Sequence, residues 1–146
     1  MPTANTTTNY VDDVFDVHKK VLSGFHYVSD EIHHPESIDD WRIPEDCERV
    51  TGDCDDFAIA CRILLREKGY ESRLLFCLTE TGGGHLICML GKMALDNRQP
   101  RPIEVESLVR HIGYTLISVS GWNPGDEWRK IKGLNDGGMR LNDDYN

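Results

Sequence analysis

Three side chains in the sequence could together attack an acyl group: Cys54, His85 and Asp96. Cys54 lies at the start of the segment with the clearest helical pattern, where unpaired backbone N–H groups and the helix dipole favour a thiolate. The same N–H groups can bind the oxyanion that forms during acyl transfer. A thiol, a basic histidine and a carboxylate that orients the histidine are the components of a Cys-His-Asp hydrolase. The sequence therefore predicts nucleophilic catalysis by Cys54.

His85 and Asp96 are expected to meet across a hairpin. His85 begins a predicted strand at 85–90, and Asp96 ends the next one, at 93–96, after a two-residue turn at Gly91-Lys92. Such a turn places Asp96 on the same side of the sheet as His85, diagonally offset and within side-chain reach. The chain order permits the start of the Cys54 helix to meet this hairpin but does not require it.

Each of the three residues also has an ordinary structural explanation. Cys54 alone is typical of a small buried residue, and His85 alone is typical of a histidine at the surface or edge of a sheet. The pair Asp96-Asn97 alone indicates a turn. Only the combination of the three, in this order and on these elements, predicts a catalytic site.

Two helices followed by consecutive strands must position these residues. Apolar residues from Tyr10 to Leu22 recur at helical spacing, with Asn9 as the predicted cap and Gly24 as the stop. The second helix has Asp53 as its predicted cap and Gly69 as its stop. Strands are predicted at 25–28, 72–78, 85–90, 93–96 and 114–119, with a short helix at 104–111. This order predicts an α+β domain in which helices pack on an antiparallel β-sheet.

The length of 146 residues fits one domain. We assign that domain to residues 10–133, with a flexible N-terminus at 1–9 and a flexible C-terminal tail at 134–146. Both ends are polar and lack apolar periodicity. Residues 29–52 are rich in carboxylates and contain prolines, which predicts a long irregular connection.

Composition excludes several classes of partner. Lys and Arg total 16 against 25 Asp and Glu, a formal net charge of -9, whereas proteins that bind nucleic acid normally carry a basic patch. The same excess disfavours an anionic membrane, and no apolar run approaches the length of a membrane span. The first nine residues lack the basic start and apolar run of a signal peptide, which predicts a cytoplasmic protein, with export by another route as the alternative. The oligomeric state is left open.

The other cysteines and histidines are mostly predicted to be structural. The five cysteines are an odd number with no CxxC pair, which predicts reduced thiols rather than disulfides or a four-cysteine zinc site. Cys47 is left undecided. Three others fall in apolar patterns and are predicted core residues: Cys61, Cys77 and Cys88. Four of the five histidines outside the candidate site are predicted at the surface: His18, His26 and the pair His33-His34.

Several segments around the candidate residues resemble one known family. The run Gly52-Asp53-Cys54-Asp55-Asp56-Phe57-Ala58-Ile59-Ala60, followed by Gly84-His85 and Leu95-Asp96-Asn97, resembles the bacterial transglutaminase-like cysteine peptidases. Trp41-Arg42-Ile43-Pro44-Glu45 and the segment at 114–122 (YTLISVSGW) are similar to two further segments of that family. The resemblance covers residues 10–122.

The resemblance implies a papain-like transglutaminase core, with the reactive cysteine at a helix N-terminus against an antiparallel sheet. It implies that Cys54 is the nucleophile, His85 the general base and acid, and Asp96 the residue that orients the imidazole. It also implies that Trp41 shapes the cleft or supplies an indole N–H there, with a packing role as the alternative.

The acidic residues beside Cys54 raise the question of a metal. Asp53, Asp55 and Asp56 surround the sulfur, and like charges raise the pKa of a thiol. Family members of the periplasmic, adhesin-processing branch need calcium, held by acidic residues that flank the nucleophile. The resemblance thus implies calcium binding by Asp53 and Asp55, with helix capping as the alternative.

The predicted function is a cysteine peptidase that hydrolyses a peptide or amide bond of a protein or peptide substrate through an acyl-enzyme on Cys54. One alternative is transglutaminase or deamidase activity on glutamine, which uses the same three residues. The other is a binding module that keeps the fold without catalysis. The small size and the lack of an export signal favour a phage or mobile-element protein.

Overall fold

Two crossed helices begin the fold. The computed structural model describes residues 6–28 and 46–131, in which α1 (Thr6–Ser23) packs against α2 (Cys54–Glu67). α1 ends just before Gly24, as predicted, but it begins at Thr6. Asn9 therefore lies inside the helix, so the predicted cap is wrong, and the helix begins before the predicted domain start at residue 10. The polar first turn has no apolar periodicity that could have revealed it.

A six-stranded antiparallel sheet follows, with strand order β6-β5-β4-β3-β7-β8. The central strands lie where the sequence predicts them. The two-residue strands of this sheet were not predicted, because they are too short to show an alternating pattern. The strands are β3 (Arg73–Leu78), β4 (Gly84–Leu90), β5 (Met93–Leu95), β6 (Ile103–Glu104), β7 (Thr115–Val119) and β8 (Arg129–Lys130). The predicted short helix is divided into α3 (Val105–Ser107) and a π-helical turn, η1 (Leu108–Ile112).

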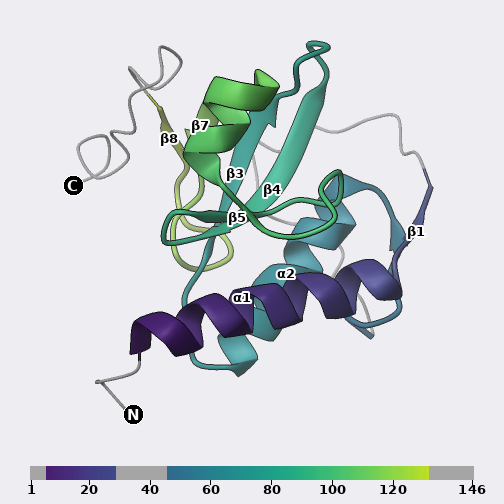
Figure 1. Ribbon diagram of the computed structural model, residues 1–146. Coiled ribbons are helices and arrows are strands. Elements are labelled where there is room, and N and C mark those ends of the chain that lie inside the picture. The colour runs from purple at the N-terminus through teal and green to yellow at the C-terminus, as the bar shows by residue number, and fades with distance from the viewer. Residues whose placement is uncertain (1–5, 29–45, 132–146) are drawn as a thin grey trace.

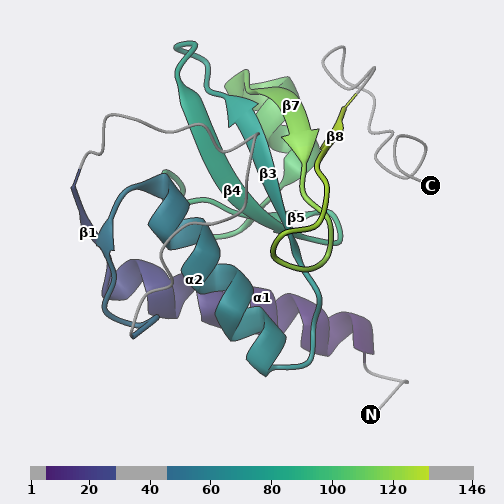
Figure 2. The same cartoon turned by 180° about the vertical axis from the view of Figure 1, so that it is seen from behind.

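Helices cover both faces of the sheet (Figures 1 and 2). α1 and α2 lie on one face, where Val14, Val17, Phe57 and Cys61 form a core with alternate residues of β4. α3 and η1 lie on the other face, over a second core that includes Leu75, Ile87 and Leu108. The expected α+β architecture, with helices on an antiparallel sheet, is confirmed.

A short parallel ribbon leads directly into α2. It joins β1 (His26–Tyr27) to β2 (Thr51–Gly52), and the Val28 N–H donates to the Gly52 carbonyl over 2.7 Å. β2 was not predicted, because 29–52 has the composition of an irregular connection. The ribbon fixes the backbone immediately before Cys54.

Among residues 6–28 and 46–131, no helix is long and apolar enough to cross a bilayer.

Candidate active site

Cys54 is the first residue of α2, and the helix start is held by reciprocal caps. The Asp53 side chain accepts a hydrogen bond from the Asp55 N–H over 3.1 Å, and the Asp56 carboxylate accepts one from the Asp53 N–H over 3.0 Å. This capping box satisfies two of the backbone donors that a helix start leaves unpaired. Asp53 thus caps the helix as predicted, and Cys54 directly follows the cap as the first residue of α2.

The surroundings of Cys54 keep its thiol protonated. The thiol donates to Oδ1 of Asp55 over 3.6 Å. Burial and then the charge of Asp55 raise the pKa of Cys54; a hydrogen bond from the Leu86 backbone N–H lowers it, and Asp53 raises it again, so the net change is upward. The effect of the neighbouring carboxylates that the sequence predicts is therefore present, and burial adds to it.

The same contacts place Cys54 at the edge of β4. β5 pairs with β4 only from Cys88 to Leu90, so the earlier part of β4 extends beyond the end of β5. The sulfur lies at the N–H of Leu86 in that extension. Leu86 directly follows His85, so the helix start and the hairpin meet, which the sequence permitted but did not require.

His85 and Asp96 are in direct contact. Nε2 of His85 and Oδ1 of Asp96 are 2.7 Å apart, and both side chains are buried. The hairpin pairs Leu90 with Met93, as predicted, and the same register continued by one residue places Asp96 diagonally from His85. Because Nε2 is bonded to the carboxylate, Nδ1 is the imidazole nitrogen left to exchange a proton with a thiol.

Further donors hold the Asp96 carboxylate. The Arg98 backbone N–H donates to Oδ1 over 2.9 Å, and the Tyr114 hydroxyl donates to Oδ2 over 2.7 Å. Burial raises the pKa of Asp96, but the hydrogen bond and charge of His85 and the bonds from Arg98 and Tyr114 outweigh it and lower the pKa overall. The carboxylate is therefore ionised and fixed in orientation.

An ion pair ties this site to the β3–β4 turn. The Arg98 guanidinium donates to both carboxylate oxygens of Glu80, over 3.0 and 2.7 Å, and its Nη1 also donates to the Tyr114 hydroxyl oxygen over 2.9 Å. The bond from Arg98 lowers the pKa of Glu80 to about 2. Tyr114 and Arg98 had no predicted role, because no local pattern links residues so far apart in the chain.

His18 corrects one of the sequence predictions. It was expected at the surface, but it is fully buried on α1, with its ring against Phe57. Its Nε2–H donates to the Asp96 backbone carbonyl over 3.0 Å. Because α1 crosses beneath α2, the side of α1 that carries His18 is turned toward the loop after β5. The apolar periodicity of a helix does not reveal this buried position, because histidine is counted as a polar residue.

The other thiols follow the predictions. Cys61, Cys77 and Cys88 are buried in the core, and burial raises the pKa of each. Cys47 is half-buried against the core of α1 and α2.

His26 is exposed, as predicted. Several predictions fall outside the described residues: those for Trp41, for His33-His34 and for the tail at 134–146.

The residues around Cys54 also form a compact group of metal-binding atoms. One ligand atom each from Asp53, Cys54 and Asp55 lies within 4.8 Å of the others, and both aspartates are buried. Asp53 and Asp55 are the two residues for which the family resemblance implies calcium binding.

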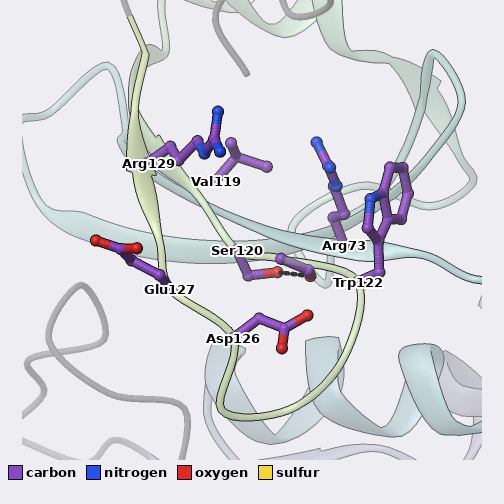
Figure 3. A pocket seen from close by; sticks show the side chains of 8 residues that line it. Arg73, Val119, Ser120, Trp122, Asp126, Glu127 and Arg129 are labelled. Atoms are coloured by element: carbon purple, nitrogen blue, oxygen red, sulfur yellow. Dashed lines mark hydrogen bonds between the residues drawn. The ribbon is translucent and has the colours of Figure 1, made fainter. Parts of the chain in front are cut away.

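A pocket of ≈ 280 Å³ lies elsewhere, around the start of β3 and the end of β7 (Figure 3). The Arg73 guanidinium stacks over the Trp122 ring at 3.5 Å from its centroid. Asp126 and Arg129 also line the pocket. None of the three candidate catalytic residues does, so this pocket is separate from the site described above.

Comparison with known proteins identifies a family and a fold. The sequence profile of the bacterial transglutaminase-like cysteine proteinases matches residues 1–136. No curated protein matches the chain significantly.

Solved structures of Legionella pneumophila LapG have a similar fold. One covers 86% of this chain and 71% of LapG, with 19% sequence identity and a TM-score of 0.63. A calcium-bound LapG structure covers 82% and 78%, with 21% identity and a TM-score of 0.54. An EGTA-treated one covers 86% and 75%, with 21% identity and a TM-score of 0.57. These bacterial structures give no support to the expected phage origin.

Proposed function

The chain belongs to the bacterial transglutaminase-like cysteine proteinases, and on that premise we propose that Cys54, His85 and Asp96 are its catalytic triad. Membership of this family makes the chain a thiol hydrolase, and we infer protein substrates for it. The observation that carries it is the 2.7 Å bond between His85 and Asp96, next to the residue whose N–H contacts the Cys54 sulfur.

The first half of the reaction forms an acyl-enzyme. Nδ1 of His85 takes the thiol proton, and the Cys54 thiolate attacks the carbonyl carbon of the peptide bond. N–H groups at the start of α2 stabilise the oxyanion. The C–N bond then breaks, and His85 gives the proton to the leaving amine. Asp96 stabilises the imidazolium while it carries that proton.

The second half releases the product. His85 removes a proton from a water molecule, which attacks the thioester carbon, and the C–S bond breaks. His85 returns the proton to the sulfur, so the enzyme is regenerated and the other product leaves as a carboxylic acid. Transfer to an amine would use the same residues, with the amine in place of water.

We also propose that Asp53 and Asp55 hold a calcium ion. Calcium prefers carboxylate oxygens, and these two buried side chains place theirs close together. One oxygen of Asp53 already caps the helix, so the pair fits calcium as part of a ligand set. A bound calcium ion would supply positive charge beside the two carboxylates. The existence of a calcium-bound LapG structure supports this proposal.

Two cysteine variants test the triad. We expect Cys54→Ala to abolish both peptide hydrolysis and labelling by iodoacetamide in the presence of calcium. Cys47→Ala is the matched control, because Cys47 is the other half-buried thiol, and it should keep both. Labelling of Cys47 with an inert Cys54 would contradict the assignment. Product analysis with an added amine distinguishes hydrolysis from acyl transfer.

A further inference from the structure

The Asp96 carboxylate is held on both of its oxygens, and the two are held differently. Oδ1 accepts from the His85 ring and from the Arg98 backbone N–H. Oδ2 accepts from the Tyr114 hydroxyl over 2.7 Å. Asp96 has no exposed surface and Tyr114 only 2%, so water cannot readily replace the phenol as a donor.

Arg98 fixes the direction of the Tyr114 hydroxyl proton. Nη1 of Arg98 donates to the phenol oxygen over 2.9 Å. A guanidinium has only donors, so the phenol cannot direct its own proton back toward Arg98. That proton is therefore directed to Oδ2 of Asp96. Glu80 in turn holds the guanidinium through two bonds.

The Tyr114 ring also contacts the imidazole. The rings of Tyr114 and His85 are 5.8 Å apart, with an interplanar angle of 87°, which is an edge-to-face arrangement. Tyr114 thus touches both partners of the 2.7 Å bond, one through its hydroxyl and the other through its ring. Such a residue restricts the rotation of both the carboxylate and the imidazole.

We propose that Tyr114 is a positioning residue of the active site, whose hydroxyl holds Asp96 so that the carboxylate stays bonded to Nε2 of His85. The proposal rests on the proposed roles of Cys54, His85 and Asp96. Tyr114 takes no part in bond making; it acts through Asp96 and keeps Nδ1 of His85 as the nitrogen that exchanges a proton with the substrate or the thiol.

Tyr114→Phe removes only the hydroxyl and tests this role. We expect kcat for peptide hydrolysis to fall roughly tenfold to a hundredfold, with KM unchanged within about twofold, because misplaced catalytic groups mainly affect the chemical step. The Nε2–H proton resonance of His85 should shift as its partner carboxylate reorients. The kinetic constants and the His85 resonance are both measured on the full chain.

The matched control is Tyr70→Phe. The Tyr70 hydroxyl also donates to an aspartate, Asp13, over 2.7 Å, but away from the site. It should leave kcat and the His85 resonance unchanged. Equal behaviour of the two variants would overturn the role of Tyr114. If Cys54→Ala retains hydrolysis in the same assay, the triad itself is wrong, and the role of Tyr114 is overturned with it.

A second pair of variants keeps the test decisive if Tyr114→Phe does not fold. Arg98→Gln and Glu80→Gln both break the same partly exposed ion pair. Only Arg98→Gln also removes the donor to the Tyr114 hydroxyl. We expect Arg98→Gln to have a lower kcat than Glu80→Gln and to shift the His85 Nε2–H resonance further. Equal effects of the two variants would overturn the proposal.

Discussion

His85 and Asp96 are joined by a 2.7 Å bond between Nε2 and Oδ1, although eleven positions separate them in the chain. The β4–β5 hairpin makes this possible, because its two-residue turn fixes a register in which the two side chains are diagonal neighbours. The bond selects which imidazole nitrogen is available for chemistry. It is therefore the relationship on which the proposed mechanism depends.

Asp96→Asn should lower kcat by roughly a hundredfold or more while the fold is kept. Asparagine is similar in shape but carries no charge to stabilise the imidazolium. Steady-state hydrolysis of a peptide substrate measures the effect. Asp13→Asn is the matched control, since Asp13 accepts a similar tyrosine bond at a remote position. Full activity of Asp96→Asn would exclude Asp96 from the mechanism.

Stability should depend on pH through His18. Burial lowers the pKa of His18, although the Asp96 carbonyl and carboxylate oppose this, and Nδ1 has no hydrogen-bond partner among the described residues. The unfolded chain therefore binds more protons than the folded protein once the pH falls below about 6.5. We expect the free energy of unfolding to decrease there, by at most about 1.4 kcal/mol per pH unit from this group.

His18→Gln isolates that contribution. Glutamine can keep a donor near the Asp96 carbonyl but does not titrate. Urea unfolding between about pH 7 and pH 5 should show a weaker pH dependence than in the unchanged chain. The exposed His26 provides the control His26→Gln, which should leave the dependence as it is. An identical pH dependence in His18→Gln would assign the titration to another group.

Calcium should raise the melting temperature and release heat on titration. Asp53→Asn and Asp55→Asn should abolish both responses, because each removes one charge and one anionic ligand. Asp53→Asn keeps a side-chain oxygen for the cap, and Asp55 takes part in the cap only through its backbone N–H. Asp56→Asn is the control, since Asp56 lies in the same helical turn but outside the ligand cluster. No heat of binding, together with a melting temperature that chelator leaves unchanged, would refute a calcium site.

Gly52→Ala should destabilise the start of α2. A Cβ at this position would lie 2.0 Å from Oδ2 of Asp56, the atom that caps the Asp53 N–H. Displacing that carboxylate should cost about 1 kcal/mol in the free energy of unfolding, measured with urea. The control is Gly83→Ala, where a Cβ would meet only Thr79 Oγ1 at 4.0 Å. Equal stabilities of the two variants would show that Gly52 is not required for the cap.

The elements around the site were largely predictable from local sequence. The cap at Asp53, the helix from Cys54 and the register of the hairpin each depend on residues that lie close together in the chain. Short-range signals of this kind are encoded by residue types and spacing. The family resemblance of the segments around Cys54 agrees with the profile match over residues 1–136.

The polar network behind Asp96 could not be predicted in the same way. Tyr114 is 18 positions from Asp96, and His18 is 78 positions away. Neither pair has a periodic pattern to connect it. The position of His18 follows from how α1 crosses α2. Apolar periodicity identifies the buried face of a helix, but it does not specify which polar residue that face also carries.

By itself, the sequence determined the helix that carries Cys54, the hairpin that brings His85 to Asp96, and the acidic residues that flank the thiol. These depend on capping, turn geometry and strand register, which act over a few residues. Only the tertiary structure decided that the helix start meets β4 at Leu86 and that Tyr114 and His18 converge on Asp96. Those contacts join distant parts of the chain, and the packing of α1, α2 and the sheet around shared cores brings them together.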